Sequence, residues 1–208
     1  MNFRMLEIDD LRGIIEKSRN KVFATIHYNS RELSTLAEQV SEIFDSIYYE
    51  GLCSAIQLNI PLPEYHELRK IKTEFPEMQI IFQANQKVME NGRPDEIAEK
   101  IKIYGDLIDY VLIDPSGGRG AEFDITKSIE IYEALRARTN LTVGFAGGFT
   151  GLNTENRVMM ISNTTNTRDF CIDAEGGLRD KLSDNYGDDI LNIKKVRGYI
   201  RTASRILG

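Results

Sequence analysis

The sequence predicts an α/β protein of the (β/α)8 TIM-barrel type, compact or incomplete, with parallel strands inside and helices outside. Short apolar runs alternate with segments of helical period along the 208-residue chain, and strands separated by helices form parallel sheets. Each of the last three apolar runs ends in polar or glycine-rich sequence, which is typical of the ligand-binding ends of such strands. No low-complexity segment or flexible linker interrupts the pattern, so residues 1–208 are expected to form a single domain.

Three strands, each followed by a helix, are expected between residues 22 and 104. Runs of β-branched and aromatic residues predict the strands, and apolar residues spaced three or four apart predict the helices. Asn29 and Ser30 are expected to cap the first of these helices, and Pro63 to lie near the first turn of the second. The expected strands are 22–28, 54–59 and 78–84, and the expected helices are 29–47, 61–74 and 94–104.

The same alternation continues to the C-terminus. Strands are expected over 110–114, 141–146 and 170–173, and helices over 125–137, from about 154, and over 189–207. The apolar face expected on the last helix consists of Ile190, Ile193, Val196, Tyr199, Ile200, Ala203 and Ile206. These patterns predict six strands in all.

Residues 2–8 are a candidate seventh strand, followed by a helix over 9–18, and no eighth strand is evident. A standard barrel has about 250 residues, so this one would be compact or incomplete, and the sequence leaves open whether a second copy, in a homodimer, completes it. The alternative is an open doubly wound sheet, which would bind a ligand at the same strand ends.

Composition excludes several classes of protein. The formal charge is −6 and no Lys/Arg block is present, so no nucleic-acid partner is expected. Two cysteines and two histidines argue against a disulfide framework or a structural zinc site. No run approaches the 18 or so apolar residues of a membrane helix, and acids in the first ten residues argue against a signal peptide. We therefore expect a cytoplasmic protein with no membrane partner, no metal and no cofactor.

Glycine pairs after the last two expected strands predict a phosphate site. Their backbone N–H groups can hold a phosphate because no side chain stands in the way, although such glycines also serve as plain turn residues. A third loop after the strand at 110–114 would cover the substrate, and Arg119 in it could contact a phosphate or carboxylate or remain solvated. The residues expected to bind substrate or phosphate are Gly117, Gly118, Arg119, Gly120, Gly147, Gly148, Gly176 and Gly177.

Four blocks of sequence resemble the phosphoribosylanthranilate isomerase family, a group of (β/α)8 barrels of tryptophan biosynthesis. The block at 109–124 is the most specific, because Asp114, the Gly-Gly-Arg-Gly turn and Phe123-Asp124 recur at the family's spacing. The blocks that carry the resemblance are 54–65, 109–124, 145–149 with 153–156, and 173–180. The resemblance implies an aldose–ketose isomerase acting on a phosphorylated sugar by an Amadori rearrangement, with Asp114 as the general acid.

The chain also departs from the family. The family's opening strand, whose cysteine is the general base, has no counterpart here, nor has the segment whose arginine binds the anthranilate carboxylate. Asn59 stands where the family has a histidine. Candidates for the base are His27, Cys171, Asp173 and Glu175, whereas Asp114 itself could instead only cap a turn. The alternative is therefore a non-catalytic protein that binds a phosphorylated ligand on the same scaffold; another phosphosugar enzyme, an epimerase or aldolase, is less well supported.

Overall fold

A computed structural model describes residues 8–19, 21–90, 92–115, 125–183 and 189–208. Within these ranges, six parallel strands form one sheet in the order β1-β2-β3-β4-β5-β6. The strands are β1 (Ile26–Tyr28), β2 (Ala55–Leu58), β3 (Gln79–Asn85), β4 (Tyr110–Asp114), β5 (Thr142–Phe145) and β6 (Cys171–Ile172). A doubly wound sheet reverses its strand order at a switch point, so the sequential order contradicts the open doubly wound alternative.

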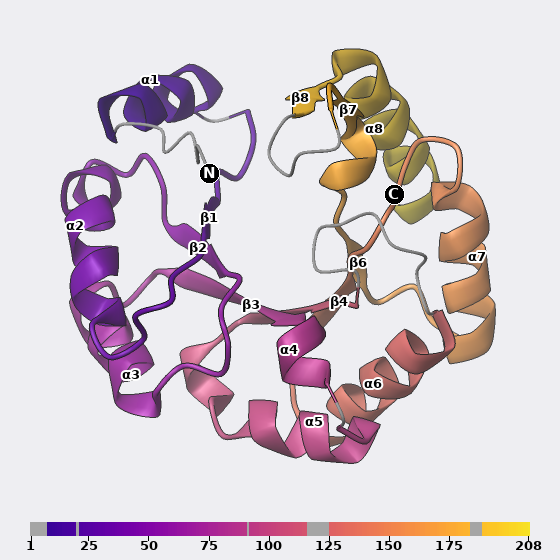
Figure 1. The fold of residues 1–208 in the computed structure, drawn as a ribbon, viewed down its shortest axis with the longest axis horizontal. Helices are drawn as coiled ribbons and strands as arrows, with labels where there is room; N and C mark the ends of the chain where they lie inside the picture. The colour runs from indigo at the N-terminus through magenta and orange to yellow at the C-terminus, as the bar shows by residue number, and fades with distance from the viewer. Residues whose placement is uncertain (1–7, 20, 91, 116–124, 184–188) are drawn as a thin grey trace.

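The helices lie on one side of the curved sheet. Right-handed crossovers between strands in sequential order place every connecting helix on the same face. Figure 1 shows α2, α3, α5, α6, α7 and α8 in an arc around the strands, with the arc open between α1 and the β7–β8 hairpin. The helices are α1 (Ile8–Ser18), α2 (Leu36–Tyr49), α3 (Tyr65–Glu74), α4 (Gln86–Met89), α5 (Pro94–Lys102), α6 (Ile125–Arg138), α7 (Thr154–Thr165) and α8 (Ile193–Leu207).

The strand predictions hold across the sheet except at its first edge strand, β1. The expected strand at 110–114 matches β4 in full, whereas only the last three residues of 22–28 form β1. Val22 and Phe23 are 64% and 60% exposed and lie outside the sheet. Residues 2–7 of the candidate seventh strand lie outside the described ranges, and Ile8 already belongs to α1. The described part of the chain thus provides six strands, fewer than the eight of a closed barrel.

Three helices begin later than the sequence predicts. The helix expected at 29 begins at Leu36, with Thr35 in the N-cap position. Ser30 instead donates a hydrogen bond from its hydroxyl to Gln39 Oε1, at 2.8 Å, from the loop before the helix. The helix expected at 61 begins at Tyr65. The closing helix begins at Ile193, after Asn192, whose side chain accepts hydrogen bonds from the first backbone N–H groups.

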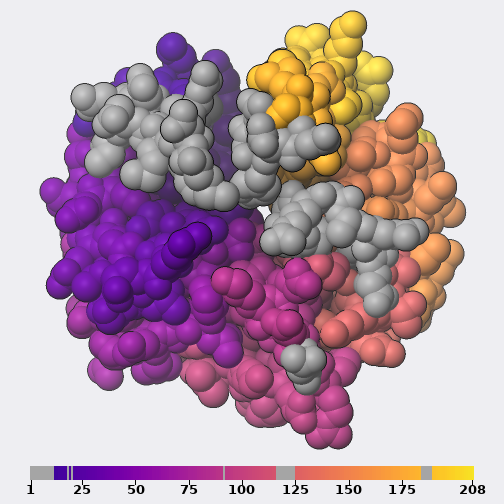
Figure 2. Space-filling model, viewed as in Figure 1, coloured from indigo at the N-terminus to yellow at the C-terminus, as the bar shows by residue number. Residues whose placement is uncertain are grey.

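A hairpin replaces the expected start of that last helix. β7 (Arg179–Lys181) pairs antiparallel with β8 (Asp189–Leu191), and Arg179 lies 3.3 Å from the Asp189 carboxylate. Ile190 and Ile193, expected on a buried helical face, are 53% and 55% exposed. Figure 2 shows the N-terminal elements, in indigo, and these C-terminal elements, in yellow, on opposite sides of one face of the molecule.

The two faces of the sheet differ in chemistry. Side chains alternate between the faces of a strand, and those facing the helices are apolar and fully or nearly buried. Examples are Ile56 of β2, Phe82 of β3 and Val111 of β4, each 0% exposed. The alternate residues of the same strands face inward and include His27, Gln57, Gln83, Asn85, Asp114 and Cys171. The apolar outer face of the sheet therefore packs against the helices, and the inner face carries the polar side chains.

Candidate functional site at the carboxyl end of the sheet

Asp114 anchors a chain of polar side chains across three strands. It is the last residue of β4, is 3% exposed, and its Oδ2 accepts a hydrogen bond from Gln83 Nε2 at 2.7 Å. Gln57 Nε2 in turn donates to Gln83 Oε1 at 2.9 Å. Since each amide both donates and accepts, the orientation of Gln83 is fixed by its two neighbours. The sequence placed Asp114 correctly at a strand end, and the structure adds the two glutamines that orient it.

Asp173 lies in the same row of the sheet as Asp114. Ile113 is paired with Phe145, and Phe145 with Ile172. Ala146 N donates a hydrogen bond to Ile113 O at 2.8 Å, and Asp173 N donates one to Phe145 O at 2.9 Å. These two bonds extend the same strand register by one residue. Asp114, Ala146 and Asp173 are thus neighbours on adjacent strands, with only a methyl group between the two carboxyl groups. Two strand spacings separate their backbones by about 10 Å, and inward curvature brings the side chains closer.

The sheet curves enough for its two edges to face each other across the interior. β1 and β6 are the edge strands, and five spacings of about 4.8 Å would separate them by about 24 Å in a flat sheet. The charge of His27, on β1, nevertheless lowers the pKa of Asp173, next to β6. This interaction and the curved sheet in Figure 1 together indicate that inner-facing groups of β1, β4 and β6 share one electrostatic environment.

Asp173 is the most strongly perturbed carboxyl group of this site. Burial raises the pKa of Asp173 from 3.8 to about 6, and the negative charges of Glu175 and Asp114 act in the same direction. His27 and the backbone N–H of Ala174 counteract part of this effect. Such a pKa lets the group both take up and release a proton near neutral pH.

Cys171 lies beside this group, and its environment disfavours the thiolate. Burial raises the pKa of the Cys171 thiol, and the charge of Asp173 adds to the effect, although the residue is accessible to solvent. A Cβ atom added to Gly144 would lie 2.4 Å from Cys171 Sγ, so the thiol crosses the inner face of β5 where glycine alone leaves room. On the far side, the Tyr199 hydroxyl of α8 donates to Ile172 O at 3.1 Å.

The first glycine pair forms a loop whose carbonyls are held by α7. Gly147 and Gly148 have φ of 109° and 64°, a region that favours glycine. Arg157 Nη1 donates to Gly147 O at 2.6 Å, and Asn153 Nδ2 donates to Gly148 O at 2.9 Å. In a trans peptide the N–H points opposite to the carbonyl. The N–H groups of Gly148 and Phe149 therefore point away from α7, as an anion-binding loop requires.

The second glycine pair packs directly against the first loop. Gly176 and Gly177 belong to a short 3-10 helix, Gly176–Leu178. A Cβ atom on Gly177 would lie 2.4 Å from Phe149 O, so only glycine permits this approach. The structure thus brings together the two pairs that the sequence predicted to act jointly. Gly117, Gly118, Arg119 and Gly120 lie outside the described residues.

Arg157 was not recognised from the sequence as part of the site. Its guanidinium lies 5.3 Å from the centre of the Phe149 ring, as well as bonding Gly147 O. Its position ten residues beyond Gly147 gives no motif that would have identified it. The arginine adds positive charge beside the loop, which favours an anion.

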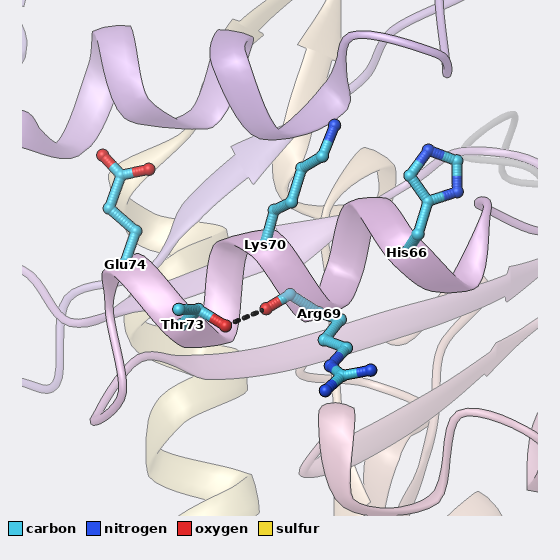
Figure 3. Close-up of a pocket in the computed structure, with 5 residues that line it drawn as sticks. All are labelled: His66, Arg69, Lys70, Thr73 and Glu74. Atoms are coloured by element: carbon cyan, nitrogen blue, oxygen red, sulfur yellow. Dashed lines mark hydrogen bonds between the residues drawn. The ribbon is translucent and has the colours of Figure 1, made fainter.

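A groove on the outer surface is distinct from this site. Figure 3 shows its five lining residues, all from α3, with His66, Lys70 and Glu74 pointing to one side and Arg69 to the other. Lys70 Nζ lies 2.6 Å from the buried carboxylate of Glu67, and His66 lies 3.3 Å from the same carboxylate. Glu67 also accepts the Ala37 N–H at 2.8 Å, so its carboxylate links α3 to the start of α2. We assign the groove a structural origin.

A metal centre and a membrane-spanning helix are two further features that would bear on function. Among the described residues, no three His, Cys, Asp or Glu side chains are grouped so that they would hold a metal ion. No helix within the described ranges combines the length and the apolar character needed to cross a membrane.

Comparisons with known proteins do not assign a family. No protein-family model matches the sequence, and no curated protein matches it. Among solved structures, the carboxyl transferase domain of Rhizobium etli pyruvate carboxylase with pyruvate is similar at 11% identity and a TM-score of 0.26. That match covers 78% of this chain and 41% of the other. At this level of similarity it says nothing about the chemistry of the site.

Proposed function

We propose that the protein is an isomerase of a phosphorylated sugar, which converts an aminoaldose phosphate to an aminoketose phosphate at the carboxyl end of its strands. The observation that carries the proposal is the row formed by Asp114 and Asp173 beside two packed glycine loops. Asp114 is the candidate acid because it is nearly buried, at a strand end, and oriented by Gln83 at 2.7 Å. The resemblance of the 109–124 block to phosphoribosylanthranilate isomerase supports phosphoribosylanthranilate as the substrate to test first.

The phosphate would lie against the two glycine loops. The outward N–H groups of Gly148 and Phe149 supply donors, and Arg157 supplies positive charge. Glu175 is exposed and lies 3.9 Å from Arg179, so its charge is partly compensated. The phosphate and the acid would then lie at the same end of the sheet, as substrate positioning in barrel enzymes requires.

The decisive experiment measures the loss of fluorescence of freshly made phosphoribosylanthranilate. Wild-type protein is expected to accelerate the loss, and Asp114→Asn, which keeps the shape of the side chain, is expected to lower kcat by about 10²–10⁴-fold. Gln83→Glu is a useful companion, because its carboxylate in place of the amide would repel Asp114 and disturb its orientation. Absence of turnover by folded wild-type protein would reject the proposal.

The second candidate is a non-catalytic protein that binds a phosphorylated ligand. It is favoured by the absence of the family's cysteine-bearing strand and by Asn59 in place of a histidine; Asn59 Oδ1 accepts a hydrogen bond from Asn85 Nδ2 at 2.9 Å. This candidate predicts that inorganic phosphate raises the melting temperature equally in wild type and Asp114→Asn, with no turnover in either. The fluorescence and melting experiments together separate the two candidates.

A further inference from the structure

The proposed reaction needs a proton acceptor, and the family's cysteine-bearing strand has no match in this chain. We infer that Asp173 is this acceptor and that it works with Asp114 as a carboxyl pair on opposite sides of the substrate. This inference rests on the proposed function and names a second catalytic residue for it. The evidence is the position of Asp173 relative to Asp114 and the environment of each competing group.

The geometry places the two carboxyl groups at one level, two strands apart. Asp114 and Asp173 occupy alternate strands of one row, with Ala146 between them. Alternate strands supply the side chains of one layer in barrel interiors, so both groups point to the same level. Ala146 contributes only a methyl group to the row between them and is 3% exposed, and about 10 Å separates the two backbones.

The other candidates for the base fit less well. The Cys171 thiol is held in its protonated form by burial and by the neighbouring Asp173 charge, and a thiol is a weak base. Glu175 is exposed, and its charge is partly taken up by the pair with Arg179 at 3.9 Å. His27 lies on the opposite edge strand, β1, where its charge acts on Asp173. The groups that face Asp173 are thus His27, Asp114, Cys171, Glu175 and, from α8, Tyr199.

The proton transfers balance between the two carboxyl groups. When the carboxyl pair holds one proton on Asp114, that proton passes to the ring oxygen, and the bond between that oxygen and C1 breaks to leave an open-chain iminium. The Asp173 carboxylate then removes the proton from C2, which gives an enolamine. The enolamine hydroxyl returns a proton to Asp114 as the C2 carbonyl forms, and Asp173 delivers its proton to C1. Both groups end in their starting states, and no other reactant is consumed.

Trapping of the open-chain intermediate distinguishes the two roles. Asp173→Asn is expected to lower kcat by about 10²–10⁴-fold while Asp114 still opens the ring. Cyanoborohydride should therefore trap the open-chain imine in Asp173→Asn above the level without enzyme, and should trap none above that level in Asp114→Asn. Glu175→Gln removes a negative charge that raises the pKa of Asp173, so the acid limb of its kcat/KM profile should move to lower pH.

The matched control is Asp169→Asn, just before β6. Asp169 is exposed and pairs with Arg136 at 2.7 Å on the outer surface, so its replacement should leave the rate unchanged. A rate for Asp173→Asn within about threefold of wild type, with Asp114→Asn inactive, would overturn the inference and leave the proposed function intact. Loss of turnover in Asp173→Asn without trapped imine would also overturn it, since the group would then be needed before ring opening. Inactive wild-type protein would reject both.

Discussion

Replacing Asp173 by asparagine is expected to stabilise the folded protein at neutral pH. The pKa of Asp173 is raised from 3.8 to about 6, which means that the fold disfavours its charged form. The unfolded chain loses this proton near pH 4 and the folded chain near pH 6, so stability falls as pH rises between these values. Above pH 6 the cost has an upper limit of about 3 kcal/mol. Solvent screening of this partly exposed group reduces the expected cost to about 1–3 kcal/mol.

Urea denaturation of wild type and Asp173→Asn at pH 7.5 and pH 4 measures this cost. The variant should have the larger free energy of unfolding at pH 7.5. In a thermal melt, each kcal/mol of added stability should raise the melting temperature by about 2–4 °C for a chain of this size. At pH 4 the difference should largely disappear, because the native aspartate is then neutral. Asp169→Asn serves as the control and should change stability by no more than about 1 kcal/mol. A variant equal to or less stable than wild type at pH 7.5 would refute the reasoning.

Three further predictions test the packing around the site. Gly144→Ala should lower the free energy of unfolding in urea by about 1–3 kcal/mol, because its Cβ would lie 2.4 Å from Cys171 Sγ. An equal loss in a Cys171→Ala background would show that the thiol is not the cause. Gly177→Ala would place its Cβ 2.4 Å from the carbonyl oxygen of Phe149, so it should separate the glycine loops and abolish the melting-temperature increase caused by inorganic phosphate. Gly13→Ala, with nothing within 4 Å of its Cβ, is the control, and an undiminished phosphate effect in Gly177→Ala would contradict the proposed site. Alkylation of Cys171 by iodoacetamide should show a pKa above the ordinary thiol value, and Asp173→Asn should lower it by removing a neighbouring charge; an unchanged profile would show that the two groups are not close.

The fold was predictable from sequence where strands are central and apolar on their outer faces. β4 was located to the residue, because Val111 and Ile113 are buried against helices and Asp114 marks the strand end. The edge strand β1 was overestimated, because Val22 and Phe23 have strand-forming side chains and yet lack a neighbouring surface to cover them. Strand propensity cannot reveal whether tertiary neighbours are present.

The start of α8 was mistaken for a similar reason. Ile190 continues the helical spacing of Ile193 and Tyr199, so local periodicity favoured one long helix. Pairing with Arg179–Lys181 instead makes Asp189–Leu191 a strand. The Asn192 side chain then caps the helix by accepting hydrogen bonds from the N–H groups of Lys194 and Lys195. A pairing between segments ten residues apart carries no signal in the helical period.

The sequence by itself determined the alternation of strands and helices, the strand-end position of Asp114, and the two glycine pairs, because each of these depends on local chemistry. Only the tertiary structure decided that the strand order is sequential, that Gly177 packs on the Phe149 carbonyl, and that Asp173 shares a row with Asp114. These three facts depend on strand register and on the curvature of the sheet. Both are set by packing between residues far apart in the chain, and no spacing within the sequence encodes them.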